Sequence, residues 1–223
     1  MAIIKKHLGS MIGAAFTLGI LPLTIAAQPA VAANLVTNGS FEQPQIPSGS
    51  IVILPSIPGW NLLPGSQGTG IEIQNNVAGS PFQGQQFVEL DSNGVTGIFQ
   101  DLATQVGETY RLEFAFSPRP GVRQNILNIN WGGQSLGTLS TSGVALNNTN
   151  WTVFSTDLLA TSPITRLSFN NFNELSNSVG TYLDAVSVTA VPEPASLLGL
   201  LGIAAVTATA TLKRKQQTAK AKA

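Results

Sequence analysis

The feature that most constrains the fold is an alternation of apolar and polar residues, which is clearest over residues 109–117. Every second residue of this segment is large and apolar, and the residues between them are polar or small. Because successive side chains of a β-strand point to opposite faces, this period of two predicts a strand with one buried and one solvated face. Such strands are typical of antiparallel sheets. The residues predicted to be buried are Tyr110, Leu112, Phe114 and Phe116.

Turn signals divide most of the remaining sequence into short segments of the same kind. Gly132-Gly133 follows an alternating run, 127–131, and favours a hairpin with 135–139 as the partner strand. About ten to twelve short strands without a helical period predict an all-β domain, either a two-sheet sandwich or a barrel. The further predicted strands are 34–36, 40–42, 51–54, 71–74, 86–90, 97–102, 152–158, 165–170 and 182–189.

The last predicted strand, 182–189, contains a change of phase. Its apolar residues suit one face at Leu183 and the opposite face from Val186 onward. A β-bulge near Asp184 would reconcile the two halves, because one extra residue moves the following side chains to the other face. We also expect this strand to lie beside the first one, since the ends of a domain are often close in space.

Apolar segments at both ends of the chain are typical of targeting signals. Residues 1–33 contain two lysines near the start, then an apolar stretch and small residues, which predicts a secretory signal peptide. An uncleaved N-terminal anchor is the alternative. Near the other end, the apolar run 195–212 is long enough for a membrane-spanning helix of about 27 Å. The basic tail 213–223 would keep the C-terminus on the inner side of the membrane.

The domain predicted between these signals, residues 34–190, has an unusual charge. It holds four arginines, ten acidic residues and no lysine, which gives a net charge of −6. An acidic domain without a basic patch is unsuited to binding nucleic acid, so we expect no such partner. The chain has no cysteine, and its single histidine, His7, lies in the predicted signal. The domain therefore has no disulfide, no zinc site of cysteine or histidine, and no histidine general base.

Five segments, taken in order, carry a resemblance to a known fold. Together they resemble galactose-binding-like jelly rolls, in particular the choice-of-anchor exported proteins of bacteria. More distantly they resemble carbohydrate-binding modules and plant cell-wall jelly-roll proteins. The resemblance covers nearly the whole domain and implies a jelly-roll β-sandwich between the signal peptide and the C-terminal helix. The segments are 34–42 with Pro58-Gly59-Trp60, then 84–91, 97–100, 107–114 and 182–186.

The same resemblance implies a structural calcium ion that ties the first strand to the last. Its ligands would include Glu42 and Asp184, and Asn38 or neighbouring carbonyl groups could complete the shell. Calcium prefers six to eight oxygen ligands of these kinds. The alternative is that Glu42 is a solvated strand residue and that Asp184 caps the bulge.

The C-terminal segment carries a second resemblance. Val191-Pro192-Glu193-Pro194, the apolar run and the basic tail occur in the order of a PEP-CTERM sorting signal. The resemblance implies processing by an exosortase-type membrane protease in a Gram-negative bacterium that makes extracellular polysaccharide. The protein would be held in the inner membrane for a time and then reach the outer surface or the matrix. The alternative is an ordinary single-span anchor in which Pro-Glu-Pro occurs by chance.

One pair of carboxylates has a spacing that could support hydrolysis. Glu89 and Asp91 lie two residues apart on a predicted strand, so their Cα atoms would be about 7 Å apart on one face. Inverting glycosidases use carboxyl groups at a similar separation, but they need two different environments for the acid and the base. Nothing in the sequence indicates a pocket around either residue. We therefore interpret both as solvated and expect no enzyme.

Exposed aromatic rings are the usual stacking surface for sugars, so the tryptophans are candidate ligand-binding residues. Trp131 lies at the predicted hairpin beside Asn130, where we expect it to be exposed, whereas Trp60 and Trp151 are expected in or at the edge of the core. Arg119 and Arg123 share a Pro-Gly loop. They could bind an anion or an acidic sugar, or they could be solvated and paired with nearby acids.

These observations favour an exported, non-enzymatic surface or matrix protein that is associated with extracellular polysaccharide. The alternative is a carbohydrate-binding, lectin-like module with its site at Trp131 or on a concave sheet face. A glycoside hydrolase is the least favoured hypothesis.

Overall fold

The computed structural model describes residues 33–173 and 178–192. Nearly all of the predicted signal peptide, together with Glu193, Pro194, the predicted span and the basic tail, lies outside the described residues. Within the described ranges no helix has the length and apolar character needed to cross a membrane. Their regular secondary structure consists of strands, which confirms the prediction of an all-β domain.

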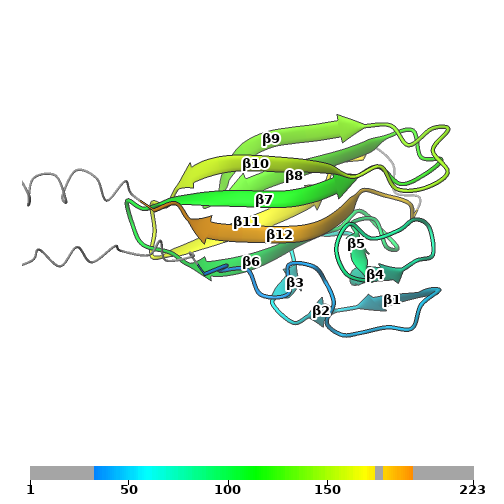
Figure 1. The fold of residues 1–223 in the computed structure, drawn as a ribbon, viewed down its shortest axis with the longest axis horizontal. Helices are drawn as coiled ribbons and strands as arrows, with labels where there is room; N and C mark the ends of the chain where they lie inside the picture. Colours follow the sequence, from blue (N-terminus) through cyan, green and yellow to red (C-terminus); the bar gives the residue numbers. More distant parts are fainter. Residues whose placement is uncertain (1–32, 174–177, 193–223) are drawn as a thin grey trace, which may run out of the picture. The chain divides into compact units, whose positions relative to one another are not determined.

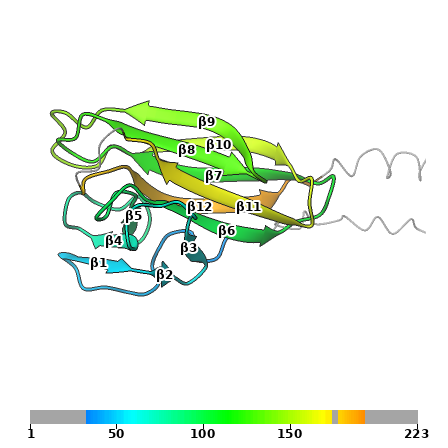
Figure 2. The same cartoon turned by 180° about the vertical axis from the view of Figure 1, so that it is seen from behind.

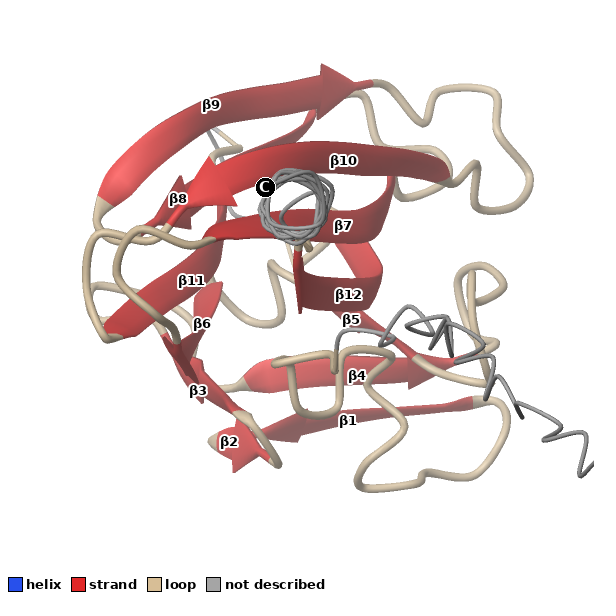
Figure 3. Cartoon of the chain, turned by 60° about the vertical axis from the view of Figure 1, so that its left-hand side comes forward, coloured by secondary structure: helices blue, strands red, loops and turns tan. Residues whose placement is uncertain are grey.

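The strands form two antiparallel sheets of six strands each, which pack face to face (Figures 1, 2 and 3). Of the two predicted architectures, the fold is therefore the two-sheet sandwich and not the barrel. Sheet A contains, in spatial order, β1 (Ser50–Leu54), β4 (Ile71–Asn75), β5 (Phe87–Glu89), β12 (Tyr182–Ala190), β7 (Thr109–Ser117) and β10 (Thr152–Leu159). Sheet B contains β2 (Ser56–Ile57), β3 (Trp60–Leu62), β6 (Gly97–Ala103), β11 (Ile164–Asn171), β8 (Asn125–Trp131) and β9 (Gln134–Thr141).

The hydrophobic core lies between the two sheets. The alternation along β7 places its four large apolar residues in this core, as predicted. The ring of Phe114 in sheet A meets that of Phe169 in sheet B edge to face, with centroids 4.9 Å apart. Trp60, also buried, lies 6.1 Å from Phe169. Burying side chains of this size contributes about 1.5–3 kcal/mol each, so a domain without disulfides can rely on this core.

The predicted hairpin and bulge are both present. Gly132 and Gly133 connect β8 to β9 with positive φ angles of 57° and 84°, which glycine adopts without steric cost. Between Asp184 and Ser187 the register of β12 against β7 shifts, and Ala185 has a φ of 50°. This bulge moves Val186 and Val188 into the core.

The two ends of the domain lie side by side, as expected. Asn34 forms an isolated antiparallel bridge with Thr189, and the Leu35 amide donates to the Val188 carbonyl at 2.8 Å. The predicted strand over 34–36 is thus reduced to this isolated bridge. The predicted strand over 40–42 is wrong, because Asn38 and Phe41 have φ angles of 55° and 57°, so the chain turns here and Phe41 enters the core from a loop. The short strands β2 and β3 were not predicted, because two or three residues are too few to show alternation.

Candidate functional site

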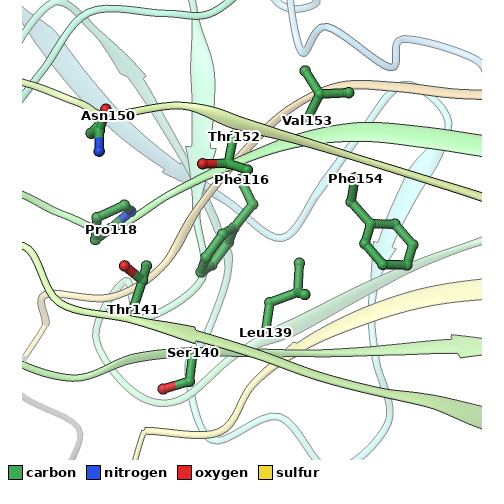
Figure 4. A pocket seen from close by; sticks show the side chains of 9 residues that line it. All are labelled: Phe116, Pro118, Leu139, Ser140, Thr141, Asn150, Thr152, Val153 and Phe154. Carbon is green, nitrogen blue, oxygen red and sulfur yellow. The ribbon is translucent and has the colours of Figure 1, made fainter.

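A pocket of about 270 Å³ opens between β9, an edge strand of sheet B, and β10, an edge strand of sheet A (Figure 4). At this side of the sandwich the two sheets are not joined by a further strand, so the core is accessible between their edges. The nine residues that line the pocket are Phe116, Pro118, Leu139, Ser140, Thr141, Asn150, Thr152, Val153 and Phe154.

The strand period decides which of these side chains face the opening. Phe154 lies directly opposite Phe114 in the ladder between β10 and β7, so alternate residues of β10 face inward. Figure 4 shows Phe116, Leu139 and Phe154 around the opening, whereas Val153 and Ser140 point away from it. Val153 is 54% exposed, which agrees with an outward direction. The pocket therefore combines apolar side chains with the polar groups of Thr141, Thr152 and Asn150, which come from the same two strand ends.

Hydrogen bonds between two loops fix the end of the pocket. The Ser117 hydroxyl accepts a hydrogen bond from the backbone amide of Asn150 at 2.9 Å and donates one to the Pro118 carbonyl at 2.9 Å. Further along, the Gly121 amide donates to the Gly143 carbonyl at 2.8 Å, and the Gly143 amide donates to the Val122 carbonyl at 2.7 Å. Hydrogen bonds between backbone groups thus join the loop after β7 to the loop between β9 and β10. The end of the pocket is therefore held in place without a ligand.

The chemistry of the pocket is that of a binding site for a neutral, partly apolar molecule. None of its nine lining residues is ionisable. Phenyl rings can cover the apolar face of a pyranose, and hydroxyl and amide groups can exchange hydrogen bonds with its hydroxyls. The lining offers no side chain that could act as a general acid or base.

The residues that sequence reasoning assigned to ligand binding lie elsewhere. The prediction that Trp131 is exposed is wrong: its ring is 6% exposed, and its Nε1 donates to the Leu159 carbonyl at 2.9 Å. The side-chain amide of Asn130 donates a hydrogen bond to Oδ1 of Asn128 at 2.7 Å. Arg123 is exposed on the loop after β7. The ring of Trp131 is therefore not available for stacking.

Sequence reasoning missed the pocket because it depends on which strands end up at the edges. The alternation of 152–158 places Thr152 and Phe154 on one face, which is the only signal that the sequence offers. Nothing in the sequence shows that this face meets the end of β9.

The interpretation of Glu89 and Asp91 as solvated residues is also wrong, since both are fully buried. Glu89 lies directly opposite Glu72 on β4, and the Gln74 amide donates to both carboxyl groups. Arg119, which comes from the loop after β7, forms an ion pair with Glu89. This buried polar cluster is separate from the pocket lining, although Pro118 of the lining is the neighbour of Arg119.

Burial controls the titration of this cluster. Loss of solvation, followed by the nearby charge of Glu72, raises the pKa of Glu89 to about 9, although Arg119 opposes the shift. Burial also raises the pKa of Glu72. The two carboxyl groups, the glutamine and the arginine hold β4, β5 and the loop after β7 together. We assign the cluster a structural role.

The residues predicted as calcium ligands are only partly brought together. Glu42 accepts from the amides of Gln85 and Gln86 at 2.8 and 2.9 Å, and Asp184 accepts from those of Phe82 and Gln83 at 2.8 and 2.9 Å. Both carboxylates therefore hold one loop, residues 82–86.

Asp184 is a buried carboxyl group, whose charge a bound cation would neutralise. Its carboxyl group is buried, and loss of solvation, with a contribution from the charge of Glu42, raises its pKa to about 7. The side chain of Asn38 is used differently, because it bonds the backbone of Gln43 and Pro58. Asn38 is therefore engaged with the backbone, and the remaining candidate ligands are the two carboxylates that hold the loop 82–86. The described residues contain no group of three or more acidic residues that could hold a metal.

Comparisons with known proteins give no family for this chain. No protein-family model matches it, and no curated protein matches it. Among solved structures, a family 61 carbohydrate-binding module in complex with β-1,4-galactotriose is similar with a TM-score of 0.48 and 15% identity, over 72% of this chain and all of that one. The xylan-binding domain of a family 22 module has a TM-score of 0.48 and 10% identity, over 73% and 97% of the two chains.

An arabinose-bound α-L-arabinofuranosidase is similar with a TM-score of 0.45 and 13% identity, over 72% of this chain but only 27% of that one. Likeness at these levels does not identify a ligand or an activity for this chain.

Proposed function

We propose that residues 33–192 form a carbohydrate-binding module that holds a neutral sugar unit in the pocket between β9 and β10. The observation that carries this proposal is the lining itself, in which the half-buried ring of Phe154 stands beside hydroxyl and amide groups without any ionisable residue. The strands on either side of the pocket leave it open to solvent, so a long polysaccharide can enter without threading. The absence of an acid or base in the lining favours binding over hydrolysis. We infer a jelly-roll topology, because successive strands from β5 to β8 alternate between the sheets.

The net charge of the domain narrows the class of ligand. With a charge of −6 and no lysine, the domain would repel an anionic polysaccharide at low ionic strength. Neutral glycans are therefore the expected ligands. Arg119 is paired with the buried Glu89, so its charge is not offered to the solvent.

The test measures binding of the purified full-length chain to immobilised neutral xylan, galactan, mannan and β-glucan, with the anionic polymer alginate beside them. We expect binding to at least one neutral polymer. Phe154→Ala removes one ring from the opening, and we expect a loss of affinity of roughly tenfold, or about 1.4 kcal/mol. The matched control is Phe172→Ala, which removes a phenyl ring that is 48% exposed outside the pocket.

Two results would contradict the proposal. One is an absence of binding to every neutral polymer, and the other is equal binding by Phe154→Ala and the parent protein. Release of reducing sugar from a bound polymer would instead support the hydrolase hypothesis.

We infer from the sequence that the module belongs to an exported protein of the cell surface or extracellular matrix. The support is the order of the predicted signal peptide, the Val191–Pro194 motif, the apolar run and the basic tail. In this hypothesis an exosortase-type protease processes the chain after transient anchoring in the inner membrane. The module would then associate with extracellular polysaccharide. Mass spectrometry of the protein from its native envelope tests this, because an intact C-terminus at Ala223 would contradict processing.

We also propose that a calcium ion bound by Glu42 and Asp184 stabilises the module. The support is the pair of carboxylates at one loop, one of them buried with a raised pKa. The ion would neutralise both charges and hold the loop 82–86 against the start of β12.

A further inference from the structure

Three large aliphatic side chains are exposed together at one end of the domain. Val106 is 65% exposed, Ile164 is 63% exposed and Leu159 is 56% exposed, which makes them the three most exposed large apolar residues in the described part of the chain. Exposed apolar residues scattered singly need no explanation, but a group at one end of a sandwich often marks an interaction surface. We call these three residues the apolar tip.

Backbone contacts place the apolar tip at the end where the described chain leaves the domain. Leu159 pairs with Thr109, and the Thr109 carbonyl accepts from the Val191 amide at 2.8 Å. Two residues before Thr109, the Gly107 amide donates to the Ala160 carbonyl at 2.9 Å, which holds the turn with Val106 beside the end of β10. In Figures 1 and 2 the ends of β6, β10 and β12 meet the starts of β7 and β11 at this end.

Charged residues near the apolar tip are partly buried or neutralised. Glu108 is half-buried in the turn beside Val106. Further from the tip, Asp157 is paired with Arg111 at 2.8 Å and Asp101 is paired with Arg166 at 2.7 Å, so each pair has no net charge. The tip is thus a nearly neutral surface on a domain whose net charge is −6.

The length of the following chain determines what can cover the tip. Only 192–194 separate Val191 from the apolar run 195–212. Four extended residue steps span at most about 14 Å. The headgroup layer on each side of a bilayer is about 5–8 Å thick, so a chain anchored through this run brings the domain end to the headgroups. As a helix the run would be about 27 Å long, slightly shorter than a hydrocarbon core of about 30 Å. All of it is therefore needed to span the core, and none of it extends the link to the domain.

We propose that the apolar tip rests on the outer surface of the bilayer in which residues 195–212 are anchored. Val106, Leu159 and Ile164 then enter the headgroup layer, where aliphatic side chains lose contact with water. The sugar pocket lies at the opposite end of β10, because Thr152 lines the pocket and Leu159 belongs to the tip. At about 3.3 Å per residue the strand separates Thr152 from Leu159 by about 23 Å, so this end of the pocket lies well above the tip.

The test uses the full-length chain in vesicles of phosphatidylethanolamine and phosphatidylglycerol. The protein contains no cysteine, so a single cysteine at position 106, 159 or 164 can carry an environment-sensitive fluorophore without background labelling. Lipids with a spin label near the headgroup should quench each of these probes roughly twofold, since the headgroup layer is only about 5–8 Å thick. The matched control is a probe at position 144, because Val144 is also aliphatic and 53% exposed but lies in the loop beside the pocket.

A second variant separates contact by the tip from insertion by the fluorophore itself. Leu159→Glu with Ile164→Glu leaves the core intact, because both side chains are exposed, and it should abolish quenching of a probe at position 106 while the chain still floats with the vesicles. Equal quenching at 106 and 144, quenching that survives the double substitution, or a chain that does not float with vesicles would each overturn the proposal. None of these outcomes depends on whether the pocket binds a sugar.

Discussion

Glu89 of β5 lies directly opposite Glu72 of β4, and both carboxyl groups are buried in sheet A. Two acids in such a position repel each other when ionised, and neither is solvated well enough to reduce the cost. The arrangement persists because Gln74 donates to both groups and Arg119 pairs with one of them. Much of the pH dependence of the domain should arise here.

Stability should fall as the pH rises from about 5 to 9. Folding raises the pKa of Glu89 from 4.5 to about 9 and that of Asp184 from 3.8 to about 7. The unfolded chain therefore releases these protons at a lower pH than the folded domain does. The stability that the protonated groups contribute is complete below their unfolded pKa values and is lost as the pH passes the folded values. Thermal unfolding followed by circular dichroism at each pH checks this, with a chelator present so that no cation occupies Asp184. Above pH 7 the decrease should come mainly from Glu89.

Glu72→Gln should weaken this pH dependence. Glutamine keeps an oxygen that can accept from Gln74 but removes the like charge that raises the pKa of Glu89. The decrease in melting temperature between pH 7 and 9 should therefore be smaller than in the parent protein. Glu113→Gln, on the exposed face of β7, is the control and should leave the profile unchanged. An unchanged profile for Glu72→Gln would show that the pair does not control this range.

Removal of calcium should lower the melting temperature if the proposed ion is present. At a concentration one hundred times its dissociation constant, a bound ion stabilises by about 2.7 kcal/mol, which corresponds to roughly 5–10 °C for a domain of this size. Asp184→Asn should abolish the difference between calcium and chelator, because Asp184 is the buried carboxylate at the proposed site. Asp157→Asn, which is exposed, should retain it. A parent protein that melts at one temperature in both conditions would contradict the proposal.

Trp131→Phe should destabilise the domain without affecting sugar binding. The indole is buried, and its loss leaves the Leu159 carbonyl without the donor that it has at 2.9 Å. The expected cost is about 1–3 kcal/mol of unfolding free energy, measured by urea denaturation. Affinity for a neutral polysaccharide, measured on the folded fraction, should be unchanged. A selective loss of affinity with normal stability would restore Trp131 as a ligand-binding residue.

Gly143→Ala should loosen the pocket. A Cβ atom at this position would lie 1.9 Å from the Arg119 carbonyl oxygen, so the two loops at the end of the pocket must separate. We expect a loss of about 1–3 kcal/mol of stability together with weaker sugar binding. Ser142→Ala, on the neighbouring exposed residue, is the control and should change neither quantity by more than about 0.5 kcal/mol. Tight binding by Gly143→Ala would show that the loop junction does not shape the site.

Local patterns predicted much of the fold because they depend on short-range geometry. The alternation on β7, the Gly132-Gly133 hairpin and the bulge after Asp184 each follow from residues that are adjacent in the sequence. Where a pattern was too short, prediction failed. Phe41 looked like a strand residue, but its positive φ makes it part of a turn.

The site could not be predicted in the same way. Trp131 directly precedes a glycine-rich turn signal that favours exposure, yet it is buried, and the Leu159 carbonyl at the end of β10 accepts its hydrogen bond. Glu89 has no neighbour in the sequence that would bury it. Its burial depends on Glu72 and Arg119, which are brought to it from β4 and from the loop after β7.

The sequence by itself determined the all-β class, the acidic charge of the domain and the absence of cysteine and histidine chemistry, because composition and a period of two are local properties. Only the tertiary structure decided that β9 and β10 are edge strands and that a pocket lies between them. It also decided that Glu89 is buried and that Val106, Leu159 and Ile164 gather at one end. The physical reason is that burial and exposure depend on contacts between residues far apart in the chain, which no local pattern records.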